Sequence, residues 1–153
     1  MPKLESLGSK QRKMLEDWPC PEFTETPWTT MNKPLSDCKV ALVTTAGLHV
    51  RGDKPFISAK GGGDTSYRVI PRSTTASEIV QSHTSIGFDR TMTFRDLNVT
   101  FPIDRLQELV ERGKIGSLSD NYYSYMGALS NVTGLLEKSG PDVASRLKKE
   151  GVE

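Results

Sequence analysis

Two histidines, His49 and His83, are the residues of this chain whose type and position best suit proton-transfer chemistry. They are the only histidines among the 153 residues, and each falls just after, or at the end of, a segment whose pattern predicts a strand. Imidazole titrates near neutral pH, so two rings facing one crevice would act as catalytic groups or bind an anion. The alternative is that each ring only hydrogen-bonds the backbone of its own loop.

The strand before His49 is predicted from Val40–Thr45, which reads VALVTT. A short apolar run followed by β-branched residues is typical of a strand buried on both faces, as in a parallel sheet covered by helices. Gly47 breaks the pattern, and a polar loop follows. Because ligands bind beyond the carboxyl ends of strands in open α/β sheets, we expect the site directly after Ala46.

The rest of the chain alternates between strand and helix patterns. Further strands are predicted at Tyr67–Ile70, Glu78–Ser82 and Asn121–Met126, with a long connection over Thr84–Val99 and helices at Ser9–Trp18, Pro102–Arg112, Asn131–Lys138 and Asp142–Glu150. The predicted fold class is α/β, a three-layer, mostly parallel sheet of the Rossmann or flavodoxin-like kind. We expect two regions: an N-terminal helix with an irregular proline-rich arm over 1–37, and the α/β domain over 38–153, with the following strand missing.

Composition excludes several classes of function. Lys and Arg number 20 and Asp and Glu 19, a net charge of +1 that gives no support for a nucleic-acid or anionic membrane surface. No apolar run is long enough to span a membrane, and the N-terminus lacks the apolar core of a signal peptide. We therefore expect a cytoplasmic protein. The two cysteines, Cys20 and Cys38, form no closely spaced redox or metal-binding pair.

A metal site is weakly indicated at best. His49, His83, Asp89 and Asp96 are suitable ligand types, but their spacing is not diagnostic of any metal centre. We therefore predict no metal, and the chain shows no dinucleotide fingerprint, Walker loop or nucleophile elbow. No cofactor is predicted.

The order of segments resembles the selenoprotein B family of the glycine, sarcosine, betaine and D-proline reductases. The resemblance runs from about Trp18 to the end of the chain, and its order is more specific than any single piece. The matching pieces are VALVTTAGLHVRGDKPF from Val40, SYRVIP from Ser66, SH at Ser82, RDLNVTFPIDRLQELVERGKIGSL from Arg95, YSYMG from Tyr123 and LLEKSGPDVASRLKKEGVE from Leu135.

This resemblance implies an enzyme reaction, the reductive cleavage of a carbon–nitrogen bond in a small amine or amino acid. In that family a selenolate or thiolate attacks and a nearby thiol resolves the product. The family places this motif after the next strand, just beyond a segment like KKEGVE. Neither Cys20 nor Cys38 matches that position, so no redox residue is carried over. We expect either the front part of a longer protein or a shortened relative.

The resemblance covers both histidines and several charged residues. We predict that His83 transfers a proton and that His49 and Arg51 contact a substrate carboxylate, because a guanidinium binds carboxylates with two hydrogen bonds.

Asp96, Asn98, Asp104 and Arg105 are also covered, and for these we predict positioning of the substrate or of the missing redox loop. The other interpretation of Asp104 and Arg105 is a helix cap and an ion-paired surface. The expected partners are a small anionic amine or amino acid and a second reductase subunit or another copy of the chain.

Two other functions compete with the reductase. The first is a non-catalytic binding or assembly module that pairs through an exposed sheet edge. The second is a flavodoxin-like domain that binds a phosphorylated ligand.

Overall fold

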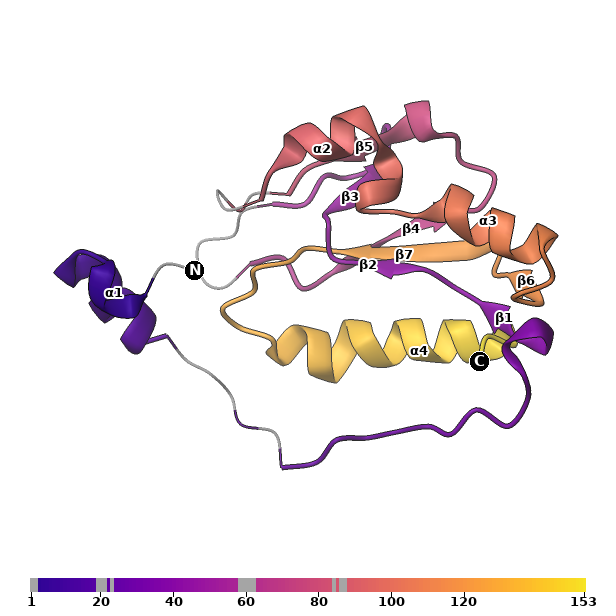
Figure 1. Ribbon diagram of the computed structural model, residues 1–153, viewed down its shortest axis with the longest axis horizontal. Coiled ribbons are helices and arrows are strands. Elements are labelled where there is room, and N and C mark those ends of the chain that lie inside the picture. Colours follow the sequence, from indigo (N-terminus) through magenta and orange to yellow (C-terminus); the bar gives the residue numbers. More distant parts are fainter. Residues whose placement is uncertain (1–2, 19–21, 23, 58–62, 84, 86–87) are drawn as a thin grey trace. The chain divides into compact units, whose positions relative to one another are not determined.

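The structure is a computed structural model, which describes residues 3–18, 22, 24–57, 63–83, 85 and 88–153 (Figure 1). Contacts between residues divide the chain into two compact units, Met1–Thr30 and Met31–Glu153. The first unit contains a short 3-10 helix, Leu4–Ser6, and the helix α1, Ser9–Glu16, which buries no residue. The expected N-terminal helix is therefore present and ends slightly earlier than predicted.

The predicted proline-rich arm is only partly covered by the described residues. Pro19, Cys20 and Pro21 lie outside them, while residues 24–34 are neither helix nor strand. A 3-10 helix over Leu35–Asp37 then leads into the first strand.

The second unit is a mixed α/β structure with seven short strands among the described residues. They are β1 (Lys39–Val40), β2 (Val43–Thr44), β3 (Leu48–Val50), β4 (Tyr67–Pro71), β5 (Ile79–Gln81), β6 (Ser117–Leu118) and β7 (Asn121–Tyr125). β7 lies between β2 and β4; it runs parallel to β2 and antiparallel to β4. β1 pairs in parallel with β6, and β3 pairs antiparallel with β5. The expectation of a mostly parallel sheet therefore holds only in part, because β4 returns antiparallel beside the central strand.

The strand predicted over Val40–Thr45 is split into β1 and β2. Lys39 lies opposite Ser117, and Val43 lies opposite Tyr123. An advance of four residues from β1 to β2 therefore corresponds to an advance of six residues from β6 to β7. The extra residues between β6 and β7 interrupt the ladder, which is how a bulge divides a strand. Both pieces keep the same direction, parallel to β6 and β7.

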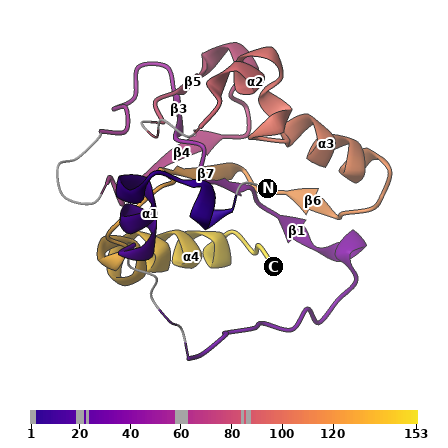
Figure 2. The same cartoon turned by 60° about the vertical axis from the view of Figure 1, so that its left-hand side comes forward.

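Helices cover both faces of the sheet (Figures 1 and 2). α3 (Ile103–Glu111) lies on one face, and α4 (Gly140–Lys149) lies on the other and continues directly from a π-helical turn over Leu135–Ser139. The predicted helix stripe of Ile103, Leu106 and Val110 packs against the core as expected. The predicted interruption at Gly140–Pro141 is wrong, because the helix runs on through both residues directly after the π-helical turn.

Successive side chains of β7 point to opposite faces of the sheet and contribute to two separate cores. Tyr122 packs edge-on against Phe101, with ring centroids 5.7 Å apart, in the core that includes Leu48 and Ile70. Tyr123 and Tyr125 point to the other face, where they pack with Val143 of α4 and its neighbours. The tyrosine-rich segment is thus a central strand with both faces buried.

The long connection predicted over Thr84–Val99 contains regular structure. A short helix, α2 (Arg90–Arg95), is followed by a 3-10 helix, Leu97–Val99. The Asp89 carboxylate accepts a hydrogen bond from the Thr91 backbone N–H at 2.9 Å, and such an N-cap satisfies a free donor of the first turn. Another 3-10 helix, Ala76–Glu78, precedes β5.

Candidate functional site

The candidate site lies where β2 and β7 end, at the rim formed by their carboxyl ends. Here the chain turns from β2 into β3. The Gly47 N–H donates to the Tyr125 carbonyl at 2.9 Å, and Ala46 forms a bridge with Met126. Gly47 has φ 65°, in the left-handed region that glycine occupies without a steric penalty. The sequence places this turn correctly after Ala46.

His83 lies at this rim and is 3% exposed. Its Nδ1 accepts a hydrogen bond from the Ser85 backbone N–H at 3.1 Å, so the neutral ring carries its proton on Nε2. The ring stacks on Phe88 with centroids 4.5 Å apart, and Arg90 donates to the His83 carbonyl. Burial lowers the pKa of His83, and the positive charge of Arg90 lowers it further. His83 is therefore neutral near pH 7, with Nε2–H as a hydrogen-bond donor and Nδ1 held by the Ser85 N–H.

Gly127, directly after β7, allows Nε2 of His83 to approach the end of the strand. A Cβ atom at Gly127 would lie 3.0 Å from Nε2 and 3.0 Å from the Thr45 carbonyl oxygen. Any side chain here would therefore press on the imidazole ring and on the end of β2. The glycine keeps the proton-bearing edge of His83 close to two strand ends.

His49 is also buried, at 5% exposure, and lies on β3. Its Nδ1 lies 2.9 Å from the Val50 carbonyl oxygen, and Nε2 has no hydrogen-bond partner among the described residues. His49 is opposite Val80, but the pairing of β3 with β5 ends at Leu48 and Gln81, and the left-handed Gly47 separates β3 from the rim. The hydrogen bonds and ring contacts of His83 within the described residues do not include His49, so a crevice shared by the two rings stays a prediction.

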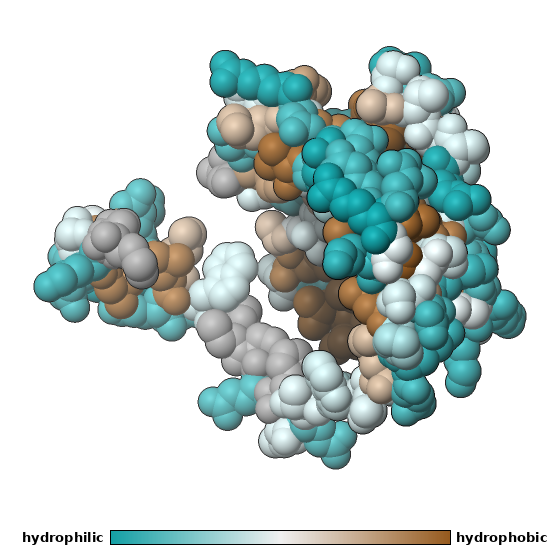
Figure 3. Space-filling view, turned by 45° about the vertical axis from the view of Figure 1, so that its right-hand side comes forward, coloured by the Kyte–Doolittle hydropathy of each residue, from teal (hydrophilic) through white to brown (hydrophobic). Residues whose placement is uncertain are grey.

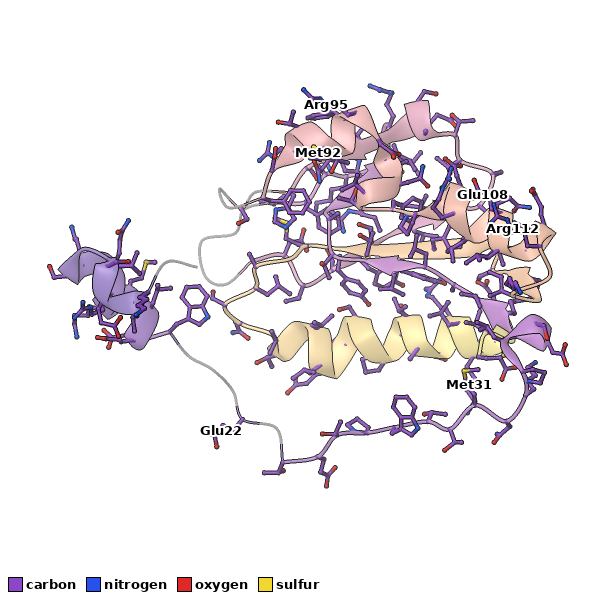
Figure 4. The ribbon with its side chains drawn as sticks, viewed as in Figure 1. Glu22, Met31, Met92, Arg95, Glu108 and Arg112 are labelled. Carbon is purple, nitrogen blue, oxygen red and sulfur yellow. The ribbon has the colours of Figure 1, made fainter. Side chains whose placement is uncertain are left out.

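The remaining predicted residues already have partners on the protein surface. Arg51 donates to the Ser77 carbonyl at 3.3 Å, beside the start of β5. Arg105 forms an ion pair with Glu108 at 2.8 Å and is 61% exposed at its side chain. Figure 4 shows Glu108 on α3 and Arg112 directly after its end, and the two form a second, longer ion pair of 3.8 Å. The predicted ion-paired surface on this helix is confirmed.

Asp96, Asn98 and Asp104 form one hydrogen-bonded cluster at the start of α3. The Asn98 amide donates to Asp96 at 3.0 Å and to Asp104 at 2.8 Å, and its oxygen accepts the Asp104 N–H at 3.1 Å. No sequence pattern predicted these mutual contacts, and a role in positioning the substrate or the redox loop stays a prediction. Their contacts join the 3-10 helix to α3, and none of their hydrogen bonds among the described residues reaches His83.

Sequence reasoning missed Phe88, Arg90 and Gly127 as neighbours of His83. Phe88 and Arg90 fall within the segment that had no clear period, so no pattern pointed to them. Gly127 had a signal, since it ends the strand pattern that began at Asn121, but a glycine at a strand end indicates only a stop. Its close contact with a ring from another strand becomes visible only in the fold.

An apolar groove of about 540 Å³ begins at the same rim. It is lined by the ends of β2 and β7 and by the apolar side of α4, among them Val43, Thr45, Gly127, Ala144 and Leu147. Figure 3 shows hydrophobic atoms gathered in a recess of the molecular surface. The rim thus combines a polar ring nitrogen with an apolar surface.

The described thiol is far from this rim. Cys38 precedes β1 and is 1% exposed, and its Sγ donates to the Pro34 carbonyl at 3.4 Å. At about 3.3 Å per residue, the six residues from Cys38 to Thr44 separate them by about 20 Å. In the described ranges no three His, Cys, Asp or Glu side chains gather closely enough to hold a metal ion. No helix in these ranges is long and apolar enough to cross a membrane.

Comparison with known proteins identifies the family. The family model described as glycine/sarcosine/betaine reductase selenoprotein B matches residues 8–153. This chain belongs to the selenoprotein B family. The resemblance found in the sequence segments is therefore confirmed. No solved structure matches the chain.

Several curated proteins are similar to this selenoprotein B family member. D-proline reductase subunit gamma of Acetoanaerobium sticklandii is 39% identical over 126 residues, 82% of this chain and 50% of that protein. Glycine reductase complex component B subunit gamma of Carboxydothermus hydrogenoformans is 31% identical over 147 residues, 94% of this chain and 33% of that protein. Sarcosine reductase complex component B subunit beta of Peptoclostridium acidaminophilum is 30% identical, over 92% of this chain and 32% of that protein. The chain spans a third to a half of the length of these relatives.

Proposed function

We propose that this chain is the α/β part of a cytoplasmic reductase that cleaves the carbon–nitrogen bond of a small amine or amino acid. Membership of the selenoprotein B family and the names of the relatives support the reaction class. The helices on both faces of the sheet support assignment to the three-layer Rossmann or flavodoxin-like group of folds. Because the relatives are named as subunits, we also propose that the chain acts together with a partner subunit.

The observation that carries a role for the rim is the burial of His83 with its protonated Nε2 at the ends of two strands. Reductive cleavage releases an amine, which must gain a proton as the carbon–nitrogen bond breaks. The imidazolium form of His83 would donate that proton; because burial and Arg90 lower the pKa of His83, this form is a minor but strongly acidic species near pH 7. The selenol or thiol would come from outside the described residues, and His83 would face it or the substrate.

The other predicted residues take lesser roles in this proposal. Arg51 and Arg105 stay candidates for contact with the substrate carboxylate, and each would first have to exchange the partner that it holds now. Asp96 and Asn98 would hold the start of α3 in place. His49 would act only if its unpartnered Nε2 became accessible to the substrate.

The test compares His83→Gln with the matched variant His49→Gln, since both replace a buried histidine. Each chain is combined with the thiol- or selenol-bearing component of a related reductase and a dithiol donor, and amine release from glycine, sarcosine, betaine and D-proline is measured. We expect His83→Gln to slow turnover about 10²–10⁴-fold, the usual contribution of general acid–base catalysis. Equal activity of the two variants would contradict the role of His83, and no turnover of any of these substrates by the unmodified chain would contradict the reductase.

A further inference from the structure

A second pocket, separate from the apolar groove, lies between α2 and β5, two elements that run side by side (Figures 1 and 2). Its volume is about 250 Å³, and it shares no described lining residue with the groove. Sites for drug-sized ligands usually measure about 300–1,000 Å³, whereas a single water molecule needs far less space than this pocket offers. The α2–β5 pocket therefore has room for one small organic molecule.

Two side chains that line this pocket hold polar atoms without partners. The Gln81 Nε2 donates to the Ala46 carbonyl at 3.1 Å, which fixes the amide orientation and leaves Oε1 as a free acceptor. Thr93 is 7% exposed, and its Oγ1 likewise has no hydrogen-bond partner in the part of the chain that the structure describes. Buried polar atoms in native proteins are nearly always hydrogen-bonded. A molecule in the α2–β5 pocket would supply both missing partners.

The other residues that line the pocket give it one cationic and one aliphatic side. Arg95, the last residue of α2, is exposed and makes no hydrogen bond or ion pair within the described ranges (Figure 4). No Asp or Glu is among the described lining residues, so an anion would meet no negative charge there. The aliphatic side consists of Leu48, a core residue, with Ile79 and Leu97, which pack against the same core. The pocket thus favours a molecule with a carboxylate and an aliphatic part.

We propose that the α2–β5 pocket binds a small α-amino acid with an aliphatic side chain, of the size of valine or leucine. The Arg95 guanidinium binds the carboxylate with two hydrogen bonds, and the Gln81 Oε1 accepts a hydrogen bond from the ammonium group. The Thr93 hydroxyl donates to the carboxylate; threonine in a helix populates two χ1 rotamers, so Oγ1 turns toward the ligand without a backbone movement. The aliphatic side chain of the ligand covers Leu48 and Ile79.

This amino-acid site does not depend on the reaction proposed for the rim. Its ligand needs an aliphatic side chain to cover the core residues and an N–H group for Gln81, so glycine and betaine each lack one of the required features. Binding is measured without any other component and without turnover. Its failure would therefore leave the reductase proposal untouched, and loss of turnover would leave this site untouched.

The test titrates the 153-residue chain with L-valine and L-leucine and follows methyl groups by NMR. We expect saturable shifts at Leu48, Ile79 and Leu97 with a Kd of about 1 mM or tighter for at least one of the two amino acids. Three related compounds each lack one group: glycine has no aliphatic side chain, isovalerate no ammonium and isobutylamine no carboxylate. Each should bind about tenfold more weakly or worse, because a buried polar or apolar group of the pocket then stays uncovered.

Two variants test the assigned contacts. Arg95→Gln should weaken binding about tenfold, while the matched control Arg112→Gln should not, because Arg112 follows α3 and pairs with Glu108 outside the pocket. Thr93→Val keeps the shape of the side chain and removes the unpaired hydroxyl. Without ligand its urea midpoint should equal or exceed that of the unmodified chain, whereas its affinity for the amino acid should fall about tenfold.

Four results would overturn the proposal. The first is the absence of saturable shifts with both amino acids. The second is a set of shifts at Val43 and Leu147 in place of the pocket methyl groups, which would assign the ligand to the groove. The third is an equal loss of affinity in Arg95→Gln and Arg112→Gln. The fourth is a lower urea midpoint of Thr93→Val, which would show that bound water already completes the hydrogen bonds of the pocket.

Discussion

Gly127 offers the sharpest test of the rim, through the substitution Gly127→Ala. The added Cβ would lie 3.0 Å from His83 Nε2 and 3.0 Å from the Thr45 carbonyl oxygen, well inside ordinary van der Waals separation. Gly127 is not among the positive-φ glycines, so alanine causes no backbone strain. Overpacking costs about 1–3 kcal/mol, while the reduced entropy of the unfolded chain returns about 0.4–1 kcal/mol. We therefore expect a net loss of stability of roughly 1–2 kcal/mol.

Urea denaturation followed by far-UV circular dichroism measures this loss, and a double-mutant cycle assigns its cause. In the background of His83→Ala, the ring contact is absent and only the contact with Thr45 remains. The cost of Gly127→Ala should then fall by about 0.5 kcal/mol or more, the usual coupling of residues in contact. If Gly127→Ala is as stable as the unmodified chain, or costs the same in both backgrounds, the described approach of Nε2 to the strand end is wrong.

Three further predictions concern the protonation of His83, the hydrogen-bonded cluster around Asn98 and the phenol group of Tyr67. Because burial and Arg90 lower the pKa of His83 below 6.5, the unfolded chain takes up this proton first as the pH falls. The unmodified chain should lose stability between pH 7 and 5.5 relative to His83→Gln, by at most about 1.4 kcal/mol per pH unit. If the urea midpoints of the two chains change equally with pH, this prediction is contradicted. Asn98→Ala breaks the bonds to Asp96 and Asp104 and should cost about 1 kcal/mol in thermal denaturation; an unchanged melting temperature would contradict the cluster. Tyr67→Phe should raise the pKa of Asp142 toward its ordinary value, because the Tyr67 hydrogen bond is the main cause that lowers it; an NMR titration of the carboxyl group measures the change.

Segments with a strong period and clear stop signals could be predicted from the sequence. α3 has an apolar stripe, a proline at its start and Gly113 after its end, so both its position and its buried face were found. The strands β4 and β7 were found for the same reason, since β-branched and aromatic residues are bounded by Pro71 and Gly127. Local patterns of this kind also placed the turn at Gly47, and with it one part of the candidate site.

Features that depend on distant pairing could not be predicted. No pattern within Tyr67–Pro71 indicates that β4 runs antiparallel to β7, because the direction of a strand in a sheet depends on the path of the chain that connects it to its partner. The six residues of α2 are too few to establish a helical period, and their first turn depends on a single cap from Asp89. The division of one predicted strand into β1 and β2 is caused by extra residues in its partner, some 80 positions further on.

The relation between the two histidines shows this limit most clearly. In an antiparallel pair, the register decides which residues of the two strands share a face. His49 opposes Val80, but the pairing of β3 with β5 ends at Leu48 and Gln81, and the left-handed Gly47 interrupts the alternation of side chains before Ala46. The connection from β3 to β5 is long, contains β4 and is no tight hairpin turn, so no local pattern sets the register between the two histidines. The role proposed for the rim therefore rests on His83 and its strand-end neighbours, whose contacts are given directly by the fold.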